Sequence, residues 1–91
     1  MTDIEELAKP VLDADATRDF LQSRVGKLLM ERIEEDIANA EADFRKADPT
    51  DTKKIMEIQN RLLRAESITQ WLGEIIVAGD NALQQAKDLS E

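Results

Sequence analysis

Carboxylates are the most abundant groups in this chain that could do chemistry, and six of them gather between residues 31 and 43. The chain has 20 Asp and Glu against 12 Lys and Arg, which gives a formal net charge of −8. Carboxylates can act as general acids and bases or bind hard cations. The six residues are Glu31, Glu34, Glu35, Asp36, Glu41 and Asp43.

The side chains that usually complete such sites are missing. The sequence contains no His, Cys or Tyr, so the commonest general bases, thiol nucleophiles and most transition-metal ligands are absent. Di-iron bundles use Glu-x-x-His pairs, whereas Glu31 and Glu34 have no histidine to join them. The stretch "DPTDT" from residue 48 lacks the twelve-residue calcium pattern with its terminal Glu. We therefore expect no enzymatic activity, cofactor or metal.

Two interpretations of the six carboxylates remain. They can form the solvated face of a helix, the ordinary role of such a run. Alternatively, they could mimic the phosphates of nucleic acid and occupy the basic groove of a host nucleic-acid-binding enzyme. The net negative charge argues against direct nucleic-acid binding by this chain.

Composition predicts an all-α protein of one domain. The chain has 91 residues, 42% apolar and 35% charged, with only three aromatic residues. The first residues are acidic and do not resemble a signal peptide, and no window reaches the length of a membrane span. We expect a soluble cytoplasmic protein that does not bind membranes.

Residues 17 to 47 and 50 to 88 each show apolar residues every three or four positions, which predicts two long amphipathic helices. The first stripe is Leu21, Val25, Leu29, Ile33, Ile37, Ala40, Phe44 and Ala47. The second is Ile55, Ile58, Leu62, Ala65, Ile68, Leu72, Ile75, Gly79, Ala82, Ala86 and Leu89, with a mean spacing near the 3.5 residues of a coiled coil.

The segment "RKADPTDTKKI" from residue 45 predicts the turn between these helices. Asp48 precedes Pro49 and is disfavoured in the α region, so the first helix should end near Ala47. Asp48 is the expected cap of the next helix, with Asp51 favouring its positive end. The short connection predicts an antiparallel helical hairpin of elongated shape.

The first 16 residues are expected to form a separate arm, and residues 17 to 91 the hairpin domain. Thr2 and Glu5 fit a capping box, so a short helix should cover residues 3 to 9 and stop near Pro10. Gly26 and Gly73 are expected to allow close approach of helices. Residues 78 to 81, with Gly79, could either break the second helix or continue it.

Four apolar residues of the second helix lie off its main stripe. Met56, Leu63 and Val77 lie on the opposite side, and Trp71 borders the stripe. They could be covered by the arm, or two hairpins could pair into a four-helix bundle; we expect a homodimer. Basic residues gather near the turn, while both chain ends are acidic. This distribution is either ordinary compensation of acidic residues four positions away or the sign of a bipolar rod whose two ends choose different partners. The basic residues are Arg45, Lys46, Lys53, Lys54, Arg61 and Arg64.

The stretches "FLQSRVGKLL" and "ADPTDTKKIMEIQNRLLRAESITQWLGEII" resemble small acidic helical proteins of tailed bacteriophages and prophages, over about residues 20 to 77. The resemblance implies a setting in the bacterial cytoplasm and a role without catalysis. We therefore expect a helical protein–protein interaction module, a phage-type assembly or accessory factor. The alternative is the acidic inhibitor or decoy described above.

Overall fold

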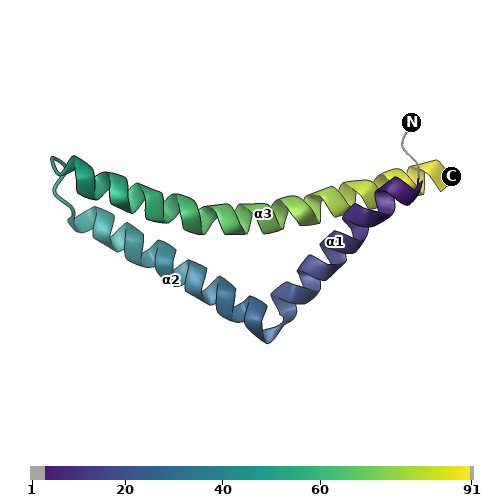
Figure 1. Ribbon diagram of the computed structural model, residues 1–91, viewed down its shortest axis with the longest axis horizontal. Coiled ribbons are helices and arrows are strands. Elements are labelled where there is room, and N and C mark those ends of the chain that lie inside the picture. Colours follow the sequence, from purple (N-terminus) through teal and green to yellow (C-terminus); the bar gives the residue numbers. More distant parts are fainter. Residues whose placement is uncertain (1–3, 91) are drawn as a thin grey trace.

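The computed structural model describes residues 4–90, and these residues form three helices and no strand (Figure 1). The helices are α1 (Ile4–Gln22), α2 (Arg24–Lys46) and α3 (Thr52–Ser90). Figure 1 shows α1 and α2 forming a V whose two open ends rest on opposite halves of the long helix α3. The all-helical prediction is confirmed. The chain turns twice, however, between α1 and α2 and between α2 and α3, whereas the predicted hairpin had one turn.

The turn between α2 and α3 lies where the sequence placed it. Helix α2 ends at Lys46, and Ala47 adopts an extended conformation with φ −69° and ψ 143°. A proline disfavours the α region for the residue before it, here Asp48, so Pro49 favours an end to the helix at this point. The two helices consequently run antiparallel and pack against each other.

The cap of α3 differs from the prediction. The carboxylate of Asp51 accepts a hydrogen bond from the Lys54 backbone N–H at 3.1 Å, the pattern of an N-cap. Asp48 instead accepts from the backbone N–H and the hydroxyl of Thr50, at 2.9 and 2.7 Å. Asp48 thus stabilises the turn, and Asp51 begins the helix.

The prediction of a single helix over residues 17 to 47 is wrong, because the chain turns a corner at Ser23. Ser23 has φ −71° and ψ 160°, and its hydroxyl oxygen accepts a hydrogen bond from the Gly26 N–H at 3.0 Å. A Cβ on Gly26 would overlap the Phe20 carbonyl oxygen of α1. Gly26 is therefore a point of close approach, as predicted, and the corner needs a residue without a side chain there.

The predicted stop near Pro10 is also wrong, since α1 continues through Pro10 to Gln22. A proline inside a helix removes one hydrogen bond and costs about 3 kcal/mol. Burial of Leu7 and Ala14, on either side of Pro10, offsets this cost. The expected boundary between residues 16 and 17 falls inside α1, and the capping residue Thr2 lies outside the described residues.

Helix α3 does not break at residues 78 to 81, because Gly79 is packed against α1. A Cβ on Gly79 would overlap the Ala14 Cβ and lie 2.7 Å from the Pro10 carbonyl oxygen. A Cβ on Gly73 would have no atom within 4 Å. The close approach expected at Gly73 therefore occurs at Gly79.

The core is divided into two parts, one at each end of α3. Between these parts, the large apolar side chains are only half-buried. The α1–α3 part contains Leu7, Ala14, Thr17, Gly79 and Ala82; the α2–α3 part contains Ile33, Ala40, Ile58 and Ala65. Gly26 is buried separately, against α1 at the corner. The half-buried middle consists of Phe20, Leu21, Leu29, Met30, Ile68, Leu72 and Ile76.

Each predicted apolar stripe faces a neighbouring helix over only part of its length. Val25 and Phe44 were expected in the core but are 66% and 51% exposed. Val25 lies just after the corner, where α2 points away from α3, and Phe44 lies at the opposite end of α2. A helix stripe can be buried only where a neighbouring helix covers it, so the stripe is open at the corner, where α2 is farthest from α3. The exposure of Phe44, at the end of α2 that rests on α3, has no such explanation.

The molecule is elongated and flat. Its extents are 59 × 31 × 15 Å, so the thinnest dimension is close to the diameter of one helix. The radius of gyration is 18.6 Å, against about 12 Å for a compact domain of this length. The accessible surface is 7080 Å², about a third above the roughly 5,400 Å² of a compact monomer of this mass.

Candidate interaction surface

Most large apolar side chains lie on the surface of this flat layer. Among the described residues only Leu7, Ile33 and Ile58 are large apolar side chains in the buried core. Twelve others are exposed, which leaves more large apolar groups in water than in the core. They are Ile4, Leu12, Val25, Leu28, Phe44, Met56, Leu63, Trp71, Ile75, Val77, Leu83 and Leu89.

The four predicted interface residues are all exposed, at 57 to 64% of their surface. Met56, Leu63 and Val77 are separated by multiples of seven residues and lie on the side of α3 away from Ile58. Gln70 occupies the missing position of this row. The row is therefore a narrow apolar line with a polar residue in its middle.

Trp71 belongs to a different row of α3. Arg61, Arg64, Ile68, Trp71 and Ile75 follow one another at steps of three and four, which places them on one side of the helix. The first three line a groove of about 430 Å³ between α2 and α3. The row thus carries Arg61 and Arg64 inside the groove and continues beyond it with the apolar residues Trp71 and Ile75.

The α2 side of this groove is formed by Ile33 and Asp36. The sequence suggested that Trp71 borders the main stripe, but it did not connect Trp71 with the two arginines. The alternating spacing of three and four from Arg61 to Ile75 was the signal that could have connected them.

The six carboxylates of the predicted acidic face do not act together. Glu31, Glu34, Glu35 and Glu41 are exposed and form no ion pair with any described residue. The other two have partners: Arg32 Nε contacts Asp36 at 3.1 Å, and Arg61 contacts Asp43 at 2.7 Å. The acidic face is therefore reduced to four glutamates.

Asp43 connects α2 to α3. The hydrogen bond from Arg61 is the largest influence on the Asp43 carboxyl and lowers its pKa below the ordinary value of 3.8; Arg61, Lys54 and Lys46 lower it further by their charge. Partial desolvation opposes this change. Asp43 is best explained as a structural partner of Arg61 rather than as a binding residue.

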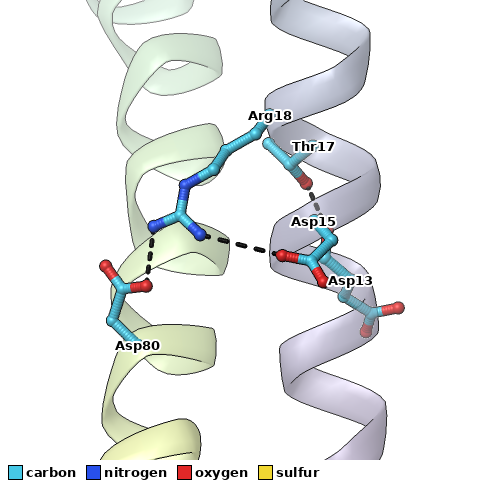
Figure 2. Close-up of polar contacts among 5 residues, drawn as sticks. All are labelled: Asp13, Asp15, Thr17, Arg18 and Asp80. Carbon is cyan, nitrogen blue, oxygen red and sulfur yellow. Dashed lines mark hydrogen bonds and ion pairs between the residues drawn. The ribbon is translucent and has the colours of Figure 1, made fainter.

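The opposite end of the molecule carries another cross-helix ion pair. Figure 2 shows Arg18 of α1 reaching α3, where its guanidinium contacts Asp80 at 2.6 Å. The same side chain lies 3.9 Å from Asp15. The hydrogen bond to Asp80 raises the pKa of Arg18, and the charge of Asp80 raises it further.

Over residues 4 to 90, no group of three carboxylates is placed to hold a metal ion. None of the three described helices is long and apolar enough to cross a membrane. In comparisons with known proteins, no family, curated protein or solved structure matched the chain.

Proposed function

We propose that this protein is a non-enzymatic helical interaction module that acts as a homodimer, in the role of an assembly or accessory factor. The observation that carries the proposal is the layer one helix thick, in which, over residues 4 to 90, twelve large apolar side chains are exposed and three are buried. The bacterial cytoplasm is the setting that we propose for it, from its resemblance to phage proteins.

Burial of apolar surface is the main driving force for such association. Each square ångström removed from water contributes about 25 cal/mol before the cost of association is subtracted. Exposed apolar patches on a small protein commonly mark contact surfaces. A second copy would cover one side of the layer and complete its core.

Sedimentation velocity over a range of concentrations tests the dimer. We expect a dimer for the natural chain and weaker association when the four predicted interface residues are changed to Asp together in one variant: Met56, Leu63, Trp71 and Val77. A strict monomer at all concentrations, together with indifference to these changes, would exclude the proposal. Far-UV circular dichroism verifies that each variant remains helical.

A second candidate function is the acidic decoy, favoured by the four unpaired glutamates on α2. Glu31, Glu34, Glu35 and Glu41 span eleven residues, or roughly 15 Å of helix. Capture of nucleic-acid-binding enzymes from bacterial extract would then weaken steeply with salt.

Reversal of these four glutamates to Lys should abolish that capture, whereas reversal of four acidic residues on α1 should not. Capture that is insensitive to both salt and reversal would exclude a decoy. Loss of capture with all reversals alike would indicate a general effect of net charge instead.

A further inference from the structure

We propose that the second copy docks antiparallel on one broad side of the layer, the Trp71 face, with the two Trp71 side chains meeting at the centre. The Trp71 face consists of Ile68, Trp71 and Ile75 from α3 and of Val25 and Leu29 from α2. This inference rests on the proposed homodimer and adds its surface and orientation.

Helical spacing places the α2 residues beside the same groove. Val25 and Leu29 precede Asp36 by eleven and seven residues, and each interval returns to within about 20° of the same side of a helix. Asp36 lines the groove, so Val25 and Leu29 continue its α2 side toward the corner. Val25 is 66% and Trp71 64% exposed. Both sides of the groove thus lead into exposed apolar residues.

The half-buried apolar residues in the middle of the molecule are not fully covered by any described helix. The contact of Ala14 with Gly79 and the ion pair of Asp43 with Arg61 mark the two ends of the middle. Between them the chain has 29 residues along α1 and α2 but only 18 along α3. At 1.5 Å per residue these paths measure about 44 and 27 Å. The α1–α2 path must therefore bow away from α3, as Figure 1 shows. This bow explains why the apolar residues of the middle are only half-buried.

The area of the Trp71 face is close to the area that each partner buries in a standard interface. A triangular layer with extents of 59 and 31 Å has an outline of roughly 900 Å², close to the 800 Å² per partner of a standard interface. The row of Met56, Leu63 and Val77 offers only one edge of one helix, interrupted by Gln70. The broad side is the better surface.

Charge and position favour the antiparallel orientation. Arg61 and Arg64 lie on the Trp71 row, in the N-terminal half of α3. A parallel copy would place each arginine over its own counterpart, whereas an antiparallel copy centred at Trp71 places position 64 opposite position 78 and keeps the arginines of the two copies apart. Trp71 is the midpoint of α3 (Thr52–Ser90), so a two-fold axis there pairs it with its own copy.

Substitution on two surfaces of α3 distinguishes the Trp71 face from the opposite row. We expect Trp71→Glu and Ile75→Glu to weaken dimerisation at least tenfold in sedimentation, while Met56→Glu and Leu63→Glu leave it within twofold. Because all four side chains are exposed, the variants should keep the natural helicity.

Each result separates the two proposals. A natural chain that remains monomeric would overturn both the dimer and this face. A dimer that tolerates Trp71→Glu but is lost with Leu63→Glu would keep the proposed function and overturn this face.

Cross-linking tests the orientation, since the chain has no cysteine of its own. Trp71→Cys should form a disulfide between two identical copies under mild oxidation. In an antiparallel pair centred at residue 71, position 64 lies opposite position 78, so Arg64→Cys should cross-link with Ala78→Cys but not with itself. Efficient self-cross-linking of Arg64→Cys would instead show a parallel pair and overturn the orientation.

Discussion

Gly79 of α3 lies against Ala14 of α1, and together they mark the place where the backbones of these helices meet. The Pro10 carbonyl oxygen lies at the same contact. Two helices can approach this closely only where one of them has no side chain. The fit of α1 onto α3 therefore depends on one hydrogen atom in place of a methyl group.

Substitution of Gly79 by Ala should lower the free energy of unfolding by about 1 to 3 kcal/mol, because the added methyl overlaps Ala14. Gly73→Ala is the matched control on the same helix. Its methyl enters open space, so it should raise stability by up to about 1 kcal/mol through helix propensity. Urea denaturation at one protein concentration measures both. Equal stabilisation by the two changes would contradict the close contact.

Ser23→Ala should lower the free energy of unfolding by about 1 kcal/mol, since it removes the N-cap of α2. Ser23→Asp keeps a side-chain oxygen for the Gly26 N–H and should retain most of the stability. Thermal unfolding followed by circular dichroism compares the two variants. If the alanine variant is as stable as the natural chain, the hydroxyl does not hold the corner.

Pro10→Ala should stabilise the protein by about 1 to 3 kcal/mol, because it restores a backbone donor inside α1 and improves helix propensity. The Pro10 carbonyl that contacts Gly79 belongs to the backbone and is unaffected by the change. Chemical denaturation measures the gain. A loss of stability would show that the proline ring itself contributes packing that alanine cannot replace.

Acid should weaken the α2–α3 contact through Asp43. Its pKa is lowered in the folded protein, so its stabilising contribution is present above the ordinary value of 3.8 and is lost as the pH falls through the lower folded value. We expect the unfolding free energy to decrease as the pH falls below about 5. Asp43→Asn should flatten part of this decrease, whereas the unpaired Glu35→Gln should not. Identical profiles for both variants would remove Asp43 from the explanation.

The sequence predicted the parts of this fold that depend on neighbouring residues. Pro49 and the polar residues around it specify a turn by local sterics and hydrogen bonds, and the structure has the turn there. The stripe of α3 also follows from spacing alone, and Ile58, Ala65, Gly79 and Ala82 are buried as it requires. The exposure of the four proposed interface residues on α3 was predictable for the same reason.

The features that sequence missed depend on contacts between distant segments. The steps of four from Leu21 to Val25 and on to Leu29 continue smoothly through the corner, so Ser23 left no interruption in the pattern. Pro10 would end an isolated helix, but α3 covers both of its flanks. The polar residues after Gly79 suggested a helix break there, but the contact with α1, which the local sequence does not reveal, decides that Gly79 rather than Gly73 lies at the close approach.

The division of the core at the two ends of α3 has a consequence for how the molecule opens. Each end is a separate packing unit, and the two are joined through α3 and through the corner at Ser23, where Gly26 of α2 lies against Phe20 of α1. Amide hydrogen exchange should therefore resolve two cooperative units, one containing α1 and the C-terminal half of α3, the other α2 and its N-terminal half. Either unit can open while the amides of the other stay protected from exchange, so the two halves of the long helix α3 should exchange at different rates.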